Sequence, residues 1–133
     1  MTSRFAQIAF TPVVKRLQSI DGSRSSYARR EAGGDEPDAL GAGEAQFIAE
    51  RDSFHMATVS ETGWPYLQHR GGPKGFLKVL DSHTLAFADF QGNRQHVSEG
   101  NLAGDDRVAL ILMDYANRRR LKLLGHARVV DAA

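Results

Sequence analysis

The pattern of apolar and polar residues changes near residue 45 of this 133-residue chain. Before that point the apolar residues recur every three or four positions, which is the spacing of one helix face. The clearest run follows Thr11-Pro12, an N-cap residue and a proline at the first helical position, and it ends at Asp21-Gly22. Its apolar members are Val13, Val14, Leu17 and Ile20. We therefore predict a helix over residues 12–21.

The rest of the N-terminal region is polar and rich in turn-forming residues. Residues 25–30 predict one further helical turn, whereas residues 32–38 combine Gly, Asp, Glu and Pro in a pattern typical of a loop. The region holds too few apolar residues to build a core of its own. We interpret residues 1–44 as a helical N-terminal arm that packs on the main domain or on a partner subunit.

A short predicted helix over residues 43–51, with Phe47 and Ile48 facing inward, leads into the period-two alternation of β-strands. The six predicted strands cover residues 53–60, 66–70, 75–80, 84–90, 107–115 and 121–130. Between the fourth and fifth strands, residues 94–102 suit a helix with Asn93 as its N-cap. Six strands with short connections predict a mainly β (α+β) fold, a six-stranded closed or partly closed barrel over residues 45–133. The chain stops where a barrel strand would finish, so we interpret the barrel as truncated at its C-terminus or the sequence as a fragment.

Composition excludes several classes of protein. Hydrophobic residues make up 41% of the chain and charged residues 25%, as expected of a globular domain and not of a disordered chain. The sequence has no cysteine, which excludes disulfides, thiolate nucleophiles and iron–sulfur clusters. No apolar run is long enough to span a membrane, and the N-terminus lacks the apolar core of a signal peptide. We expect a cytoplasmic protein that does not bind membranes.

The net charge of +1 argues against bulk binding of nucleic acid, but the charge is unevenly distributed. Residues 1–69 carry seven Lys and Arg against nine Asp and Glu, whereas residues 70–128 carry ten against six. The basic excess therefore lies in the second half of the chain.

No established catalytic or metal-binding motif accompanies that charge. The nucleophile pattern G-x-S-x-G does not occur, and the five histidines have no metal-ligand spacing, so we expect no metal and assign no catalytic residue. The histidines are His55, His69, His83, His96 and His126.

Cations and glycines instead point to an anion. Lys74 and Lys78 bracket the apolar Gly75-Phe76-Leu77, and Arg94 lies in the first turn of a predicted helix, where backbone N–H groups favour a negative charge. Glycines at positions 71, 72, 75 and 92 permit close approach of the backbone to a ligand. The other cations of this region are Arg70, Arg118, Arg119, Arg120 and Lys122. Together they predict a phosphate held by Arg and Lys, with a flat group lying along a strand.

Five segments follow one another in a specific order: Gly75-Phe76-Leu77-Lys78, residues 85–95 (LAFADFQGNRQ), Asn101-Leu102, residues 106–110 (DRVAL) and residues 120–125 (RLKLLG). Together they resemble the pyridoxamine 5′-phosphate oxidase-like family of FMN-binding split barrels. The strand pair at 54–60 and 66–70 is similar to theirs as well. The resemblance covers roughly residues 45–131, and the order of its elements is more specific than any one motif.

The resemblance implies a split β-barrel and a homodimer with FMN at the subunit interface. Backbone groups of residues 73–78 would read the polar edge of the flavin ring, and Lys78 would reach the phosphate or the ring. Arg94-Gln95 stands at the family's basic pair, with the second cation lost, and Arg120 stands where a glutamine meets the partner's flavin. The implied cofactor-binding residues are Lys74, Gly75, Phe76, Leu77, Lys78, Ala88, Asp89, Arg94, Gln95 and Arg120.

The function that the resemblance implies is that of an FMN-dependent oxidoreductase, which transfers a hydride through flavin N5 to or from a small-molecule substrate of unknown identity. We do not carry over pyridoxamine phosphate oxidation, because the C-terminal segment that binds pyridoxal phosphate in the true oxidases is absent from this sequence. Two alternatives stay open: a non-catalytic split-barrel module that binds haem or another cofactor, and an interaction domain. Haem would need an axial ligand, for which His55, His69 and His126 are candidates.

Overall fold

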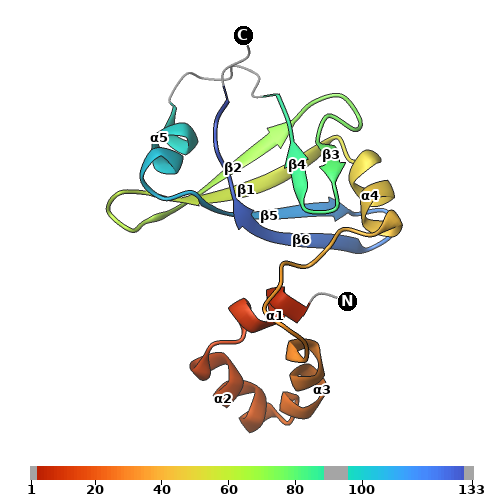
Figure 1. Ribbon diagram of the computed structural model, residues 1–133, viewed down its shortest axis with the longest axis vertical. Coiled ribbons are helices and arrows are strands. Elements are labelled where there is room, and N and C mark those ends of the chain that lie inside the picture. Colours follow the sequence, from red (N-terminus) through yellow and green to blue (C-terminus); the bar gives the residue numbers. More distant parts are fainter. Residues whose placement is uncertain (1–2, 89–95, 131–133) are drawn as a thin grey trace. The chain divides into compact units, whose positions relative to one another are not determined.

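A computed structural model of the chain describes residues 3–88 and 96–130. The chain divides into two compact units: residues up to 41 together with 81–83, and residues 42–80 together with 84 onward. Figure 1 shows the helices of the first unit and the sheets of the second. None of the described helices is long and apolar enough to cross a membrane.

The first unit contains four short helical segments. They are α1 (Ser3–Ala9), α2 (Pro12–Asp21), α3 (Arg24–Ala28) and the 3₁₀ turn η1 (Arg29–Glu31). The predicted helix over residues 12–21 is confirmed: Thr11 Oγ1 accepts a hydrogen bond from the Val14 amide at 3.4 Å, and Gly22 ends the helix in the left-handed conformation. Glu31 connects η1 to the neighbouring helices, because its carboxylate pairs with both Lys15 and Arg24.

Helix α1 was not predicted from the sequence. The backbone amides of Arg4 and Phe5 donate to the two carboxylate oxygens of Asp38 at 3.0 and 2.9 Å, so a residue far along the chain satisfies the first turn of this helix. Ala6 is buried against the rest of the unit. A local sequence pattern cannot reveal a cap supplied from more than thirty residues away.

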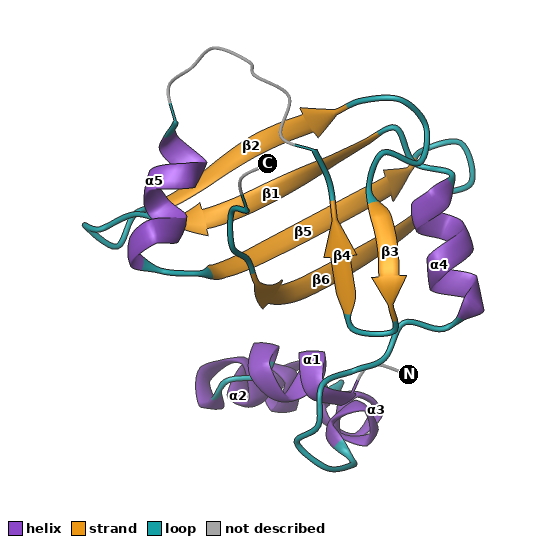
Figure 2. Ribbon diagram, turned by 45° about the horizontal axis from the view of Figure 1, so that its top comes forward, coloured by secondary structure: helices purple, strands orange, loops and turns teal. Residues whose placement is uncertain are grey.

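The second unit is an antiparallel α+β arrangement built around a four-stranded sheet. Its strands are β1 (Ser53–Val59), β2 (Pro65–Gly71), β5 (Arg107–Asp114) and β6 (Arg119–His126), in the order β2-β1-β5-β6. A separate two-stranded sheet consists of β3 (Lys78–Asp81) and β4 (Thr84–Ala86) and lies over one face of the larger sheet (Figure 2). Helices α4 (Ala42–Ala49) and α5 (Val97–Gly104) lie at opposite ends of the larger sheet (Figure 2).

The predicted number of strands is confirmed, but the prediction of one closed or partly closed barrel is not. Within the described residues the six strands form two sheets, and no closed barrel is present. β3 begins at Lys78 and not at residue 75, because Gly75 has a φ of +78° and the Phe76 amide donates to the Pro73 carbonyl in a turn. β4 ends at Ala86, several residues before its predicted end. The shortened strands limit how far the smaller sheet can pair with the larger one.

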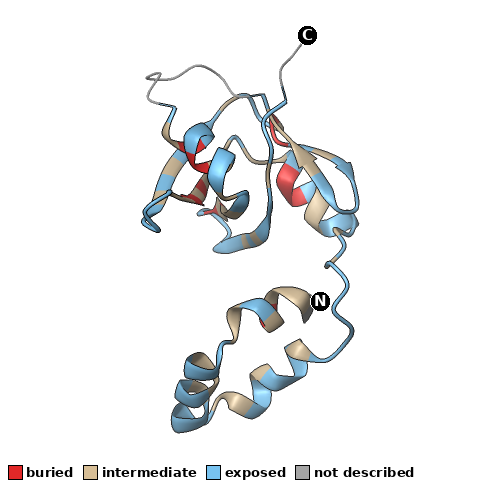
Figure 3. Cartoon of the chain, turned by 60° about the vertical axis from the view of Figure 1, so that its left-hand side comes forward, coloured by how far each residue is buried: buried red, intermediate tan, exposed pale blue. Residues whose placement is uncertain are grey.

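The core lies between the larger sheet and the elements that cover one of its faces, here called the inner face. Phe54, Met56 and Thr58 of β1 are buried on that face, alternating with half-buried residues. The ring of Phe54 stacks on Phe76 at 5.5 Å between centroids and meets Phe87 edge to face at 5.1 Å. Figure 3 shows that most of the buried residues belong to this second unit.

The opposite, outer face of the sheet has an apolar row that crosses all four strands. Leu67 pairs with Ala57 in β1, Ala57 pairs with Ala109 in β5, and Ala109 pairs with Leu124 in β6. Leu67 is 64% exposed and Leu124 is 41% exposed. This row is therefore an apolar surface open to solvent within the single chain.

Candidate functional site: the basic end of the sheet

Strand order brings two cationic segments to the same end of the larger sheet. β2 and β5 finish at this end, and β1 and β6 begin there, because neighbouring strands are antiparallel. The loop that follows β2 carries Lys74, and the turn between β5 and β6 leads into Arg118, Arg119 and Arg120. We call this region the basic end.

The glycines of the loop after β2 serve packing within the chain. A Cβ atom at Gly72 would lie 2.9 Å from the Phe76 ring, and one at Gly75 would lie 3.0 Å from the Ala49 carbonyl oxygen. The amides of Gly72 and Gly75 donate to the carbonyls of Asp52 and Arg51 at 3.0 and 2.9 Å. The atoms that approach these two glycines in the chain are the protein's own, and these contacts dock the loop beside the end of α4.

Two exposed cations, one in this loop and one at the start of β3, flank a buried pair of residues. Phe76 and Leu77 are buried in the core, whereas Lys74 and Lys78 are exposed. Burial of the pair holds the backbone between the two lysines in place, so both ammonium groups are presented at the surface from a fixed segment.

Of the other predicted site residues, the structure describes Ala88 and Arg120. Ala88 is exposed after β4, and Arg120 is exposed near the start of β6, at the basic end. Strands β2 and β6 are three spacings apart, about 14 Å. Lys74 lies in the loop that follows one edge strand, β2, and Arg120 lies on the other edge strand, β6. Asp89, Arg94 and Gln95 lie outside the described residues.

Arg70 belongs to the inner face and not to the exposed basic end. It lies opposite Phe54 in the β1–β2 register, and its guanidinium carbon is 5.7 Å from the centre of the Phe87 ring. Its aromatic neighbour Phe87 thus packs with Phe54 and Phe76 in the core.

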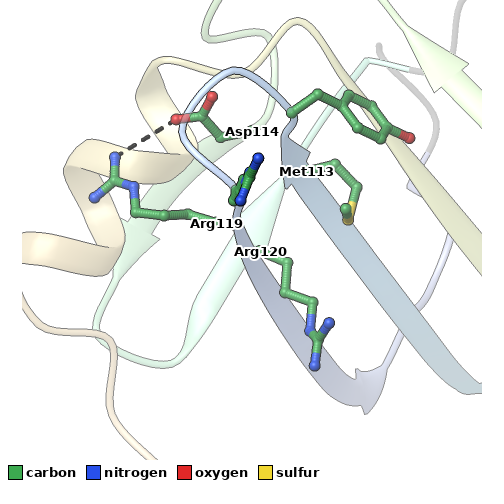
Figure 4. Close-up of a pocket in the computed structure, with 6 residues that line it drawn as sticks. Met113, Asp114, Arg119 and Arg120 are labelled. Carbon is green, nitrogen blue, oxygen red and sulfur yellow. Dashed lines mark ion pairs between the residues drawn. The ribbon is translucent and has the colours of Figure 1, made fainter.

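The turn between β5 and β6 forms a pocket at the basic end. Its volume is about 590 Å³. It is lined by Met113, Asp114, Tyr115, Arg118, Arg119 and Arg120 (Figure 4). Figure 4 shows Arg119 directed toward Asp114, while Arg120 extends away from it.

Asp114 is the acidic residue of this pocket and has several polar partners. The residue is only 6% exposed. Its carboxylate accepts hydrogen bonds from the backbone and side-chain nitrogens of Asn117 at 3.3 and 2.9 Å, and it pairs with Arg51 and Arg119 at 3.7 Å each. The Asn117 side-chain hydrogen bond, with smaller contributions from its backbone amide and the two arginines, lowers the pKa of Asp114 below its usual value. Asp114 is therefore ionised near neutral pH.

The two arginines that pair with Asp114 also lie over the ring of Phe47 in α4. The guanidinium carbons of Arg51 and Arg119 lie 4.5 and 5.4 Å from the centre of its ring. Arg51 also donates to the Met113 carbonyl at 3.2 Å. Sequence reasoning placed residues 107–115 on a strand and missed the Arg51–Asp114 pair, because its members lie 63 positions apart in sequence.

The histidines considered as haem ligands have other neighbours. The rings of His55 and His69 lie on adjacent strands with centroids 5.2 Å apart, and His126 Nδ1 lies 2.7 Å from a carboxylate oxygen of Asp106. Across residues 3–88 and 96–130, no three His, Asp or Glu side chains form a group that could hold a metal ion.

Comparison with protein families decides the affiliation of this unit. Residues 43–133 match the family described as Pyridoxamine 5′-phosphate oxidase, and this match covers more than half of the chain. The chain belongs to this family. Members of the pyridoxamine 5′-phosphate oxidase family typically bind a flavin, so the basic end and the adjoining sheet belong to a flavin-binding type of domain. Comparison with curated protein sequences and with solved structures gives no match.

The residues present fit the phosphate of a flavin nucleotide through side chains. The Phe76 ring and the Ala49 carbonyl fill the space beside Gly72 and Gly75, so these two glycines serve packing within the chain. Lys74 and Lys78, by contrast, are exposed on a segment anchored by two buried residues. Ammonium groups in such a position supply charge-assisted hydrogen bonds to a phosphate.

Proposed function

We propose that this protein is an FMN-dependent oxidoreductase whose substrate is a small molecule. The observation that carries the proposal is the pair of exposed lysines, Lys74 and Lys78, fixed around buried Phe76 and Leu77 within the region that matches a flavin-binding family. Lys78, Lys74 and Arg94 hold the phosphate in this proposal. The backbone of residues 73–78, with Ala88 and Asp89, lines the flavin ring.

Bound flavin would supply hydride transfer through N5, chemistry that requires no nucleophilic side chain. The chain's own contribution is positioning and electrostatics. Exposed cations bind the negative phosphate, and the packed loop after β2 keeps their spacing constant. In this proposal backbone groups form hydrogen bonds with the polar edge of the ring. Gln95 lies next to Arg94 at the phosphate.

The active unit that we propose is a homodimer with the cofactor at the subunit interface. The apolar row on the outer face, with Leu67 and Leu124 exposed at its two edges, supports this proposal because it is a surface of the kind that subunit contacts bury. In the dimer Arg120 reaches the flavin held by the partner subunit, from the same end of the sheet as Lys74.

Purified full-length protein tests the cofactor assignment directly. We expect the visible absorption bands of oxidised flavin, or uptake of added FMN measured as quenching of its fluorescence. A Soret band would support the haem-binding alternative instead. A colourless protein that takes up no FMN would refute the flavin proposal.

Substitution of the cations tests the position of the phosphate. Arg94→Ala and, more mildly, Lys78→Ala should weaken FMN binding, because a charge-assisted phosphate contact contributes about 1.5–3 kcal/mol. The matched control is Arg16→Ala, which removes an exposed positive charge from α2 in the first unit. Equal FMN affinity in all three variants would show that the phosphate binds elsewhere.

A further inference from the structure

Helix α2 presents its apolar side outward from the first unit. Val13, Leu17 and Ile20 are spaced four and three positions apart, so they form one stripe along the helix, and they are 55%, 58% and 77% exposed. On the opposite side of the helix, Lys15 pairs with Glu31 of η1 at 3.2 Å. A surface helix normally buries its apolar side and exposes its polar side. The α2 stripe is therefore suited to a contact that the first unit does not supply.

The α2 stripe has the spacing of a coiled-coil seam. Val13 and Ile20 are seven positions apart and Leu17 lies between them, as at positions d, a and d of a heptad repeat. Lys15 then occupies position f, which points away from the seam, in agreement with its ion pair inside the unit. The stripe thus matches the face that one helix offers to another helix.

Two charged residues flank the α2 stripe, one on each side. Arg16 is at position g and Asp21 at position e of the same heptad pattern. Both are exposed, and no ion pair or side-chain hydrogen bond engages either of them within residues 3–88 and 96–130. Asp21 is also the last residue of α2, where the helix dipole disfavours a negative charge. An arginine from another chain would offset this cost.

The two charges are complementary to those of a second copy of the same helix. Arg16 precedes Asp21 by five positions, the separation at which g and e residues of two parallel helices in register face each other. Arg16 would then lie beside the partner subunit's Asp21 on both sides of the pair. In an antiparallel pair the arginines would share one side and the aspartates the other, so the charges favour the parallel orientation.

We propose that α2 is an interaction surface for a second copy of this chain, and that the two α2 helices of a homodimer pair in parallel along the stripe. A pair of ten-residue helices is too short to form, or to set an oligomeric state, by itself. The inference therefore rests on the proposed function in one respect, the homodimer, whose subunits hold the two helices at a high effective concentration. It goes beyond that function because the proposed dimer contact lies on the outer face of the sheet.

The stripe and the charges have different tasks in this pair. The apolar side chains supply the contact, whereas exposed ion pairs contribute little free energy and select the orientation. Loss of a single charge, as in Arg16→Ala, leaves the dimer and its cofactor site in place, since the outer face of the sheet holds the subunits together.

The absence of cysteine from the sequence makes disulfide formation a direct test. In the full chain, Ile20→Cys would place two thiols opposite each other across a parallel pair in register. Ser19→Cys is the matched control, because Ser19 is exposed on the same helix at position c, away from the stripe. With oxidised glutathione, we expect Ile20→Cys to form covalent dimers at least about tenfold faster than Ser19→Cys. Circular dichroism of the reduced variants checks that both are folded.

Charge reversal tests the orientation. In the Ile20→Cys protein at low salt, Arg16→Asp should slow disulfide formation about threefold or more, because both sides of the pair would then carry only negative charge. Adding Asp21→Arg exchanges the two charges and should restore the rate. A rate that stays low in this double reversal would overturn the parallel pairing.

Equal rates for Ile20→Cys and Ser19→Cys, or no covalent dimer from either, would overturn the proposal as a whole. Light scattering and FMN binding of the same reduced samples separate this failure from failure of the proposed function. Reduced dimers that bind FMN but form no disulfide refute only the pairing of α2. Disulfide-linked chains that bind no FMN refute only the flavin assignment.

Discussion

The buried side chain of Asn101 donates a hydrogen bond from Nδ2 to the hydroxyl of Thr58 at 2.9 Å, which ties α5 to the inner face of β1. One helical turn earlier, Ser98 donates to the Gln68 side chain of β2 at 2.7 Å. Both contacts lie on one face of α5. They fix α5 against the neighbouring strands β1 and β2.

Removal of the Thr58 hydroxyl should therefore destabilise the protein. We expect Thr58→Val to lower the free energy of unfolding by about 1–3 kcal/mol, because the Asn101 amide would lose its partner in a buried site. Thr58→Ser keeps the hydroxyl and is the matched control. Urea unfolding measures both variants, and a Thr58→Val protein as stable as Thr58→Ser would show that the hydrogen bond contributes little.

The second prediction concerns the effect of two glycines in the loop after β2 on stability. Gly72→Ala and Gly75→Ala should each lower the free energy of unfolding by about 1–3 kcal/mol: the first would crowd the Phe76 ring, and the second would add a side chain at φ +78° against a backbone carbonyl. Gly100→Ala is the control, since a Cβ there meets nothing within 4 Å and alanine favours a helix. Thermal unfolding should place the control at or above the Tm of the unaltered protein. A Gly72→Ala protein of unchanged stability would contradict the packing role of this glycine.

Local sequence patterns predicted most of the elements because those elements depend on local signals. Thr11 and Gly22 cap α2 from adjacent positions, and the alternation of β1 places Phe54, Met56 and Thr58 on one buried face. The pattern failed where a distant contact decides the structure. Asp38 caps α1 across more than thirty residues, and no local signal announces it.

In the candidate site, too, local features could be predicted from the sequence and long-range contacts could not. Sequence reasoning found the lysines around Phe76 and Leu77, and it interpreted Gly72 and Gly75 as allowing close approach of the backbone to a ligand. It missed their packing role, because a sequence does not show that the Phe76 ring and the Ala49 carbonyl approach these glycines. It also missed the pairing of Arg51 with Asp114, which depends on strand order and on the packing of α4.

Asp114 makes the free energy of unfolding depend on pH in the acidic range. The pKa of its carboxyl is lowered in the folded protein, so its contribution is fully present above the unfolded pKa of about 4 and is lost as the pH falls through the folded pKa. Asp114→Asn removes this contribution. In urea unfolding, we expect the gap in stability between the two proteins to be largest above about pH 5 and to narrow toward pH 3. Asp35→Asn, in the exposed loop of the first unit, is the control and should leave the acid dependence unchanged. A constant gap for Asp114→Asn would show that its ionisation is not linked to folding.

The apolar row on the outer face tests the proposed homodimer. Leu67 and Leu124 lie at its two edges, and a charge introduced at either position would have to be buried without a partner in any dimer that uses this face. We expect Leu67→Glu and Leu124→Glu to shift the protein from dimer to monomer in light scattering after size-exclusion chromatography. Leu80→Glu is the matched control, because Leu80 is as exposed as Leu67 but lies on β3, outside the four-stranded sheet. If the cofactor binds between subunits, the two variants that dissociate should also lose FMN, whereas Leu80→Glu should retain the dimer. Dimers that persist in both sheet variants would place the subunit contact on another surface, and monomers that keep full FMN affinity would place the flavin within one chain.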